Sequence, residues 1–268
     1  MFIKLADSLI SCLNRHPKLI KRLGWFIQVL VVIQSVLMWA AGKEFETYTD
    51  CLFHNRKQAK HPWIKERTIE YPWVYKRVSN LNNCRILDVG AKEGLPITDL
   101  LLENHNYVYA IDINTSGTRK TGNLSFVKGD IVSTSFEDNF FDAVILVSTL
   151  EHIGVAGRYG VTQQDEEGDF RAMRESYRIL KPGGRVIVTV PYGVGKSLPL
   201  NRLYNAERIK RIFDGFEINE SQYFKFNSTY QLWLDVPETV AAGNNWDNDQ
   251  WYAIACFDAR KSASGRAQ

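Results

Sequence analysis

The chain of 268 residues has few cysteines, and these are scattered along it. They form no CxxC pair, and no histidines accompany them at the spacing of a zinc site. A metal centre is therefore not expected, and free thiols in a reducing cytosol are the natural interpretation. The cysteines are Cys12, Cys51, Cys84 and Cys256.

A large excess of charge of one sign is also missing. The net charge of +3 is too small to predict a nucleic-acid partner, and the surplus sits mostly in the first eighty residues. The sequence contains no internal repeat and no low-complexity tract. With 45% hydrophobic residues, the chain is long enough for one well-buried domain with an appendage.

The first 44 residues differ from the rest in their pattern. Apolar residues recur at helical spacing over residues 2–14, which predicts an amphipathic helix. After Pro17 and several basic residues, residues 23–42 contain no charge, and tryptophans lie near both ends of this run. About 20 apolar residues is the length that crosses a bilayer. A signal peptide has a shorter apolar core nearer the start, so cleavage is not expected.

Two interpretations of this apolar run remain open. Its two glutamines and one serine allow a helix that is buried against the protein's own domain. Membrane association is the favoured alternative, but the basic residues precede the run and would keep the N-terminus in the cytosol. A single span would then remove the rest of the chain from the cytosol. We therefore expect residues 1–42 to attach to the cytoplasmic face of a membrane without crossing it.

From residue 85 onward, apolar strands alternate with helices. This alternation predicts a doubly wound, mainly parallel α/β sheet of seven strands with an N-terminal helical extension. Residues 45–84 are expected to be a linker and a helical cover of the cofactor site, with a short helix opening at Pro72. The helix before Lys181-Pro-Gly-Gly184 should end at that segment. The main domain is expected over residues 85–260, followed by a disordered tail over 261–268. Strands are expected at 85–89, 107–112, 124–128, 142–147, 184–190, 216–224 and 250–259, and helices at 95–104, 167–180 and 206–214.

The first predicted strand runs into a turn with glycines four residues apart, Gly90 and Gly94. A dinucleotide fingerprint needs a third, central glycine, because the pyrophosphate approaches the backbone there. Lys92 occupies that place instead. Asp88, just before the turn, would repel a diphosphate and attract a cation. The turn therefore favours a positively charged cofactor over a nicotinamide dinucleotide.

Acids also end the next two predicted strands, at Asp112 and Asp130. A carboxylate at a strand end can accept two hydrogen bonds from vicinal hydroxyls, as Asp112 would from a ribose. Each acid taken alone could instead be an ordinary turn or capping residue. Three acids at successive strand ends would line one crevice, which favours a shared ligand.

These segments together resemble the class I S-adenosylmethionine-dependent methyltransferases of the small-molecule "type 11" branch. Ile86-Leu-Asp-Val-Gly90 resembles the first motif of that family. The likeness continues through Ala110-Ile-Asp112, Gly129-Asp130-Ile131, Phe141 to His152, and Arg178 to Val188. It covers about 40% of the chain (residues 85–191). Lys92 departs from the small residue that the family usually has.

The resemblance implies S-adenosylmethionine as the cofactor. Asp112 would bind both ribose hydroxyls, Asp130 would bind the adenine amine, and Ile131 would pack on the adenine. The cofactor-binding residues implied in full are Asp88, Gly90, Gly94, Asp112, Ile113, Asp130, Ile131 and Ser148.

Glu151-His152 follows the fourth strand, where the family places residues that face the methyl donor and acceptor. An imidazole suits a general base that deprotonates a hydroxyl, although His152 could equally be a structural histidine. The implied reaction is methylation, most simply on oxygen, of a small-molecule, glycan or lipid-linked acceptor. The sequence identifies neither the acceptor nor the oligomeric state. Two rival functions remain: a nucleotide-sugar or NAD oxidoreductase, and an inactive membrane-tethered binding module of the same fold.

Overall fold

The computed structural model describes residues 66–91, 96–102, 104–157, 159–227, 232–245 and 253–262. The chain divides into two compact units. One comprises Ile69–Lys225 and Asp235–Gln268 and holds the predicted methyltransferase segments. The other comprises Met1–Thr68 and Phe226–Leu234; within it, the rings of Phe226 and Trp233 meet edge to face at 5.5 Å. The amphipathic and apolar segments predicted over residues 1–44 lie outside the described residues.

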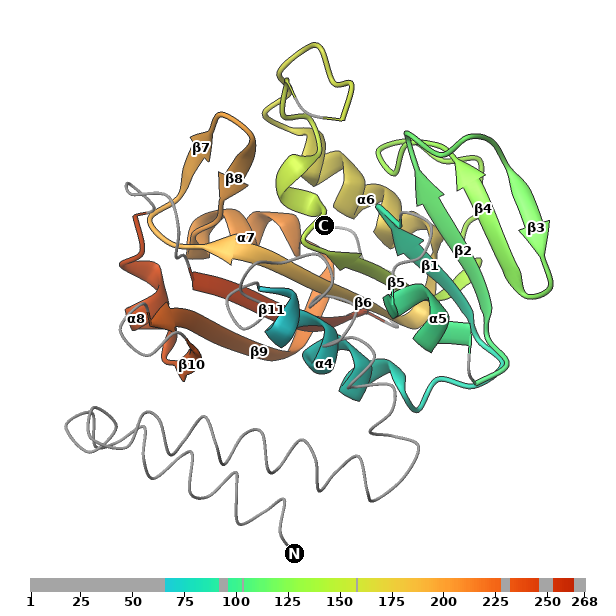
Figure 1. Cartoon of the computed structure of the whole chain (residues 1–268), viewed down its shortest axis with the longest axis horizontal. Helices are drawn as coiled ribbons and strands as arrows, with labels where there is room; N and C mark the ends of the chain where they lie inside the picture. Colours follow the sequence, from blue (N-terminus) through green and yellow to red (C-terminus); the bar gives the residue numbers. More distant parts are fainter. Residues whose placement is uncertain are drawn as a thin grey trace, which may run out of the picture. The chain divides into compact units, whose positions relative to one another are not determined.

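Strands and helices alternate along the described chain, as the sequence predicts (Figure 1). The helices are α4 (Arg67–Val78), α5 (Pro96–Leu102), the short 3-10 helix η1 (Leu150–His152), α6 (Gly168–Ile179), α7 (Ala206–Ile212) and α8 (Glu238–Ala242). The strands are β1 (Arg85–Val89), β2 (Tyr107–Asp112), β3 (Arg119–Thr121), β4 (Leu124–Lys128), β5 (Phe141–Val147), β6 (Leu180–Tyr192), β7 (Lys196–Leu198), β8 (Asn201–Leu203), β9 (Phe216–Asn227), β10 (Leu232–Val236) and β11 (Ala253–Lys261).

The main sheet has nine strands in the order β10-β9-β11-β6-β5-β1-β2-β4-β3. Strands β1, β2, β4, β5 and β6 pair in parallel, whereas β11 runs antiparallel to both β6 and β9. The prediction of a mainly parallel, doubly wound sheet is confirmed. The predicted number of strands was wrong, because the short edge strands β3 and β10 add to the seven that the apolar runs indicated.

Helices cover both faces of this sheet, and the alternation along β6 shows which helix covers which face. Val186, Val188 and Val190 share a buried core with residues of α6 and α7. The intervening residues face α4: Arg185 donates to the Arg77 carbonyl, and Thr189 donates to Glu70. The continuous apolar run of β6 follows from this burial on both faces.

Three local predictions need correction. The helix before the sheet begins at Arg67, not at Pro72, which lies inside it. The Lys181-Pro-Gly-Gly184 segment does not separate α6 from the next strand, because β6 already begins at Leu180. It bulges out of the β5–β6 ladder, whose register moves from Phe141↔Leu180 to Ala143↔Arg185. The last strand reaches Lys261, one residue into the predicted tail, where Lys261 donates to the Leu180 carbonyl.

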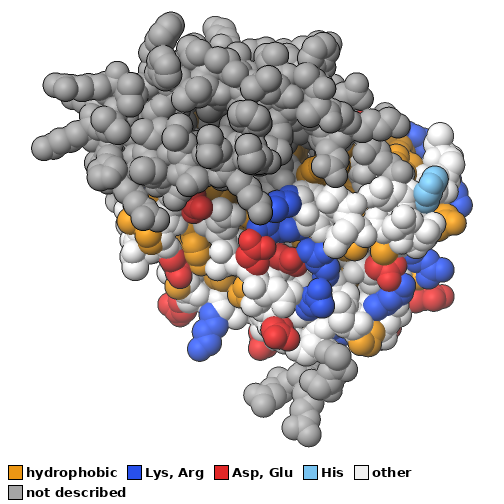
Figure 2. Space-filling model, turned by 90° about the horizontal axis from the view of Figure 1, so that it is seen from below, with side chains coloured by type: hydrophobic (Ala, Val, Ile, Leu, Met, Phe, Trp, Pro, Cys, Tyr) orange, Lys and Arg blue, Asp and Glu red, His pale blue; other side chains and the backbone are white. Residues whose placement is uncertain are grey.

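The β7–β8 hairpin, η1 and α8 are elements that the sequence patterns did not reveal. Each is only 3 to 5 residues long, too short for periodicity to be recognised. The surface shown in Figure 2 has basic and acidic side chains interspersed on its described part. This mixture agrees with the small net charge of the chain.

Candidate functional site

The sheet order places a topological switch point between β1 and β5. From β1 the chain moves outward through β2 and β4, and then returns to build β5 and β6 on the other side of β1. In open α/β sheets, ligands bind in the crevice at the carboxyl ends of the strands beside such a point. The turns after β1, β2, β4 and β5 all lie along this edge.

Asp88 lies on β1 and is almost fully buried, with 3% of its surface exposed. Thr98, in the first turn of α5, donates its hydroxyl to Oδ2 of Asp88 at 2.7 Å. Burial raises the pKa of Asp88 to about 7, and the bond from Thr98 opposes part of that rise. The carboxyl group therefore links β1 to α5 and changes its charge near neutral pH.

Gly90 begins the turn after β1 in the left-handed region, with φ of 75°. A side chain here would meet Thr149: an added Cβ would lie 2.7 Å from both Cγ2 and Oγ1 of that residue. The Thr149 hydroxyl donates a hydrogen bond to the Val89 carbonyl oxygen, with 3.0 Å between the two oxygens. The turns after β1 and β5 are thus in direct contact, and glycine is required at position 90 by backbone angle and by space.

Ser148 directly follows β5 and has a left-handed conformation, with φ of 43°. Its hydroxyl donates to Oε1 of Glu70 at 2.6 Å, and Thr189 of β6 donates to the same oxygen at 2.6 Å. The Ser148 amide bonds the Thr189 carbonyl at 3.1 Å. The sequence predicted Ser148 as a cofactor-binding residue, and the structure places its hydroxyl in this internal network.

The acids that end β2 and β4 are more accessible. Asp112 is half-buried, and its Oδ1 accepts the Asn114 amide at 2.6 Å. Asp130 is exposed, and its Oδ1 accepts the Val132 amide at 3.0 Å. Each acid therefore forms a local turn with one carboxylate oxygen. Among the described residues no hydrogen bond reaches the second oxygen of either acid.

The two isoleucines that follow these acids differ in their surroundings. Ile113 is 37% exposed, so its side chain is accessible to a ligand. Ile131 is 4% exposed and belongs to the hydrophobic core. Of the two, only Ile113 presents apolar surface to solvent.

His152 ends η1, directly after the β5 turn. Its Nδ1 lies 2.9 Å from the Leu200 carbonyl oxygen, which can only accept a hydrogen bond. Nδ1 therefore donates this bond, and in the neutral ring Nε2 is the unprotonated nitrogen. Nε2 lies 3.6 Å from Oε1 of buried Glu151, and the ring meets Tyr159 edge to face at 5.4 Å. This arrangement is compatible with both roles considered for His152.

The structure brings together Asp88, Gly90, Asp112, Asp130 and Ser148 at one edge of the sheet. Gly94 and Lys92 lie outside the described residues. Sequence reasoning missed Glu70 and Thr149, which hold the turns after β1 and β5. The only sequence signal for Thr149 was its place after a strand, and Glu70 had none. The described residues contain no cluster of acids, histidines or cysteines that could hold a metal ion.

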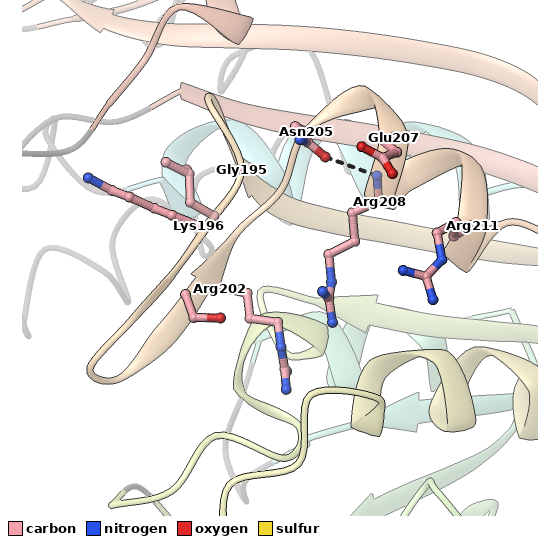
Figure 3. A pocket seen from close by; sticks show the side chains of 9 residues that line it. Gly195, Lys196, Arg202, Asn205, Glu207, Arg208 and Arg211 are labelled. Atoms are coloured by element: carbon pink, nitrogen blue, oxygen red, sulfur yellow. Dashed lines mark hydrogen bonds between the residues drawn. The ribbon is translucent and has the colours of Figure 1, made fainter.

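A cavity of about 240 Å³ lies beside the β7–β8 hairpin and α7 (Figure 3). Three arginines line it, but each already has oxygen partners. Arg208 bonds both carboxylate oxygens of Asp169 at 2.8 Å. Arg202 donates to two backbone carbonyls, and Arg211 lies 3.5 Å from Glu167. These contacts tie the hairpin and α7 to residues 153–169, and carboxylates pair with the charges of Arg208 and Arg211.

Comparisons with known proteins agree with this arrangement. The family model described as "Methyltransferase domain" matches residues 87–188, which run from β1 to the middle of β6. Residues 87–188 are thus similar to a methyltransferase domain. The match spans the switch point and the turns after β1, β2, β4 and β5, but not α4, the β7–β8 hairpin or α7.

Two curated relatives each match about a third of the chain. Sterol 24-C-methyltransferase of Neurospora crassa is 34% identical over 111 residues, which are 37% of this chain and 26% of the relative. A ubiquinone/menaquinone biosynthesis C-methyltransferase of Pseudomonas paraeruginosa is 36% identical over 86 residues, 32% of this chain and 28% of the relative. The chain thus spans little more than a quarter of the length of either relative.

Solved structures share the fold at low sequence identity. An N1-methyltransferase of Burkholderia thailandensis, solved with 1,6-didemethyltoxoflavin and S-adenosylhomocysteine, has a TM-score of 0.50 and 16% identity, covering 81% of this chain and 86% of its own. The [4+2]-cyclase SpnF has a TM-score of 0.50 and 21% identity, covering 72% and 79%. A cyclase on this fold shows that the architecture alone does not define the reaction.

Proposed function

We propose that the chain is an enzyme that transfers a methyl group from S-adenosylmethionine to an acceptor bound beside the β5 turn. The observation that carries this proposal is the convergence of Gly90, Asp112 and Asp130 at the switch point of a methyltransferase-family domain. Cofactor specificity depends on such a site rather than on the fold.

The residues present fit this cofactor. The second carboxylate oxygen of Asp112 suits ribose hydroxyls, and Ile113 offers exposed apolar surface beside it. Asp88, whose pKa is raised by burial to about 7, becomes negative when a cation approaches, which suits the cofactor's ammonium group. When bound, S-adenosylmethionine supplies a methyl group that is activated by its sulfonium.

The protein's part in the reaction is then alignment and removal of a proton. Transfer would join the acceptor oxygen to the methyl group that the cofactor supplies, and the electron pair of the broken carbon–sulfur bond would remain on sulfur. His152 receives the acceptor proton on Nε2, because Nδ1 is held by the Leu200 carbonyl. This tautomer supports O-methylation. The relatives named above are C-methyltransferases, so the methylated atom is a central point to test.

The distribution of exposed apolar residues supports an acceptor with an apolar part. Seven large hydrophobic residues are exposed among the described residues. Tyr107 and Ile218 lie at strand starts, near the amino edge of the sheet. Ile113 and Val194 follow the carboxyl ends of β2 and β6, Tyr159 lies in the segment after η1, Leu200 lies between β7 and β8, and Val240 lies on α8. We infer that the carboxyl edge receives a lipid-linked or similarly apolar acceptor.

The N-terminal segment supports the same inference from the sequence. An uncharged run over residues 23–42 beside an amphipathic, basic segment suits attachment at the cytoplasmic face of a membrane. No helix among the described residues is long and apolar enough to span a bilayer. Deleting residues 1–42 should release a protein that still binds cofactor from the membrane fraction. Wild-type protein that partitions wholly into the soluble fraction would contradict membrane attachment.

Cofactor titration separates this proposal from its rivals. Calorimetry should detect binding of S-adenosylmethionine and S-adenosylhomocysteine, and no binding of NAD. Preferential binding of NAD would favour the oxidoreductase. Cofactor binding without transfer of labelled methyl to any component of a cell extract would favour the inactive binding module.

The acceptor can be found by mass spectrometry of lipid and glycan extracts from cells with and without the gene. The proposal predicts a species that is lighter by one CH₂ group, about 14 Da, when the gene is absent, and fragmentation identifies the methylated atom. With the acceptor known, Leu200→Ser should raise KM, whereas Ile218→Ser, an equally apolar change at the opposite edge, should not. Equal effects of the two substitutions would contradict an apolar acceptor edge.

A further inference from the structure

Glu70 is a completely buried acid outside the segment that the methyltransferase family model matches. It lies on α4 and reaches the carboxyl edge of the sheet, where Ser148 and Thr189 both donate to its Oε1 at 2.6 Å. Burying a carboxyl group is costly unless it is hydrogen-bonded. A buried acid with two such bonds at the edge of a binding crevice requires an explanation.

The helix itself does not need Glu70 in order to dock. Trp73 donates its indole Nε1 to Gln222 at 2.8 Å, and Val74 is completely buried. Arg77 pairs with Glu220 on the same strand, β9. These contacts fix α4 on the sheet along its length, so the hydrogen bonds of Glu70 serve a more local purpose.

The hydrogen bonds of Glu70 hold the backbone of the turn after β5. Ser148 has φ of 43°, a left-handed conformation that an L-residue adopts at a cost unless its neighbours impose it. Its amide bonds Thr189, and its hydroxyl bonds Glu70. Glu70 therefore closes a ring of hydrogen bonds that joins α4, the end of β5 and β6.

The conformation of Ser148 determines where Thr149 lies. Thr149 in turn lies against Gly90, where an added Cβ would be only 2.7 Å from its Oγ1. It also places Oγ1 3.0 Å from the Val89 carbonyl oxygen. Through two adjacent residues, Glu70 thus reaches the first glycine of the predicted cofactor turn without touching the crevice itself.

We propose that Glu70 is a positioning residue, which fixes the Ser148–Thr149 turn and thereby shapes the cofactor turn at Gly90. This inference rests on the proposed methyltransferase function for its consequence in cofactor binding. Its structural part, the fixing of the turn, can be measured without any ligand.

The test compares Glu70→Ala, Glu70→Gln and Val74→Ala in the full-length chain. Glutamine keeps a carbonyl oxygen that can accept both hydroxyls, whereas alanine removes the acceptor. Val74→Ala loosens the packing of the same helix without touching the network. Hydrogen exchange of residues 146–150 should accelerate at least about 10-fold in Glu70→Ala and change little in the other two variants. Affinity for S-adenosylhomocysteine should fall about 10-fold or more in Glu70→Ala alone.

Variants of the donors provide an independent arm if Glu70→Ala fails to fold. Ser148→Ala and Thr189→Val each remove one hydroxyl and should accelerate exchange of the same segment. Unchanged exchange in all network variants would overturn the proposal, and so would a glutamine variant that behaves like alanine. If the wild type binds no S-adenosylhomocysteine, the proposed function fails, while the exchange data still decide whether Glu70 fixes the turn.

Discussion

The turns after β2 and β4 and the turn after β5 lie along the same edge of the sheet but are held in different ways. Asp112 and Asp130 each accept a hydrogen bond from a backbone amide two residues further along the chain. Ser148 instead donates to Glu70, 78 positions earlier, while its amide bonds Thr189, 41 positions later. The first kind of turn is local, and the second depends on distant elements.

This difference separates two kinds of functional position. A local turn is formed by its own residues. The acid at the strand end uses one carboxylate oxygen in that turn and keeps the other available for a ligand. A turn that is held from afar takes its shape only after the helix and the neighbouring strand have docked. We therefore expect mutations in the long-range turns to disturb the site as a unit, and mutations in the local turns to remove single ligand contacts.

The largest expected effect is at Gly90, which contacts Thr149 in the turn that is held by distant residues. Gly90→Val should reduce affinity for S-adenosylhomocysteine by more than about 100-fold, because the new side chain collides with Thr149. Gly122 also has a positive φ, 57°, but an added Cβ there meets nothing within 4 Å. Gly122→Val is therefore the matched control and should keep wild-type affinity in calorimetry. Equal losses in both variants would show that backbone strain, not contact with Thr149, sets the requirement for glycine.

His152 is also held from afar, by the Leu200 carbonyl 48 positions later. His152→Gln should lower kcat by about 10²–10⁴-fold if the imidazole is the base, with little change in cofactor affinity. The exposed His105, before β2, offers the control substitution His105→Gln, which should leave kcat unchanged. A His152→Gln enzyme that retains most of its turnover would assign the residue a structural role.

Asp88 lies between the two cases, since its partner Thr98 is 10 positions away on the next helix. Because burial raises its pKa to about 7, the folded protein holds this proton more tightly than the unfolded chain does. The stabilisation is fully present below about pH 4 and is lost as the pH rises towards 7, on the order of 1–4 kcal/mol in total. Asp88→Asn should remove this pH dependence, which chemical denaturation between pH 4 and 8 measures. A variant with the same pH profile as wild type would show that Asp88 is not its source.

Substitutions in the local turns should remove single ligand contacts. Asp112→Ala should weaken cofactor binding by about 1.5–3 kcal/mol for each charge-assisted bond that is lost. Asp130→Ala should cost less, because Asp130 is exposed and its bond to the ligand competes with water. Calorimetry with S-adenosylhomocysteine measures both. A larger loss for Asp130 than for Asp112 would reverse the assigned roles of the two acids.

Much of the fold could be predicted because its strands are buried on one or both faces. The bounds of β1, β2 and β4 match the predicted ranges, since an apolar run that ends in an acid or a turn marks a buried strand plainly. The sequence predicted a strand in the region of β11 but did not specify its antiparallel pairing with β6 and β9. The short edge strands carry too few residues for any periodic signal.

The sequence by itself determined the methyltransferase-domain match of residues 87–188, the succession of strands and the acids at three strand ends. These features are local, because each depends on residues within one strand and the turn that follows it. Only the tertiary structure decided that Asp88 is buried against Thr98, that Thr149 demands a glycine at position 90, and that Glu70 holds Ser148. Those contacts join residues 10 to 78 positions apart, so no pattern within a short window of sequence can specify them.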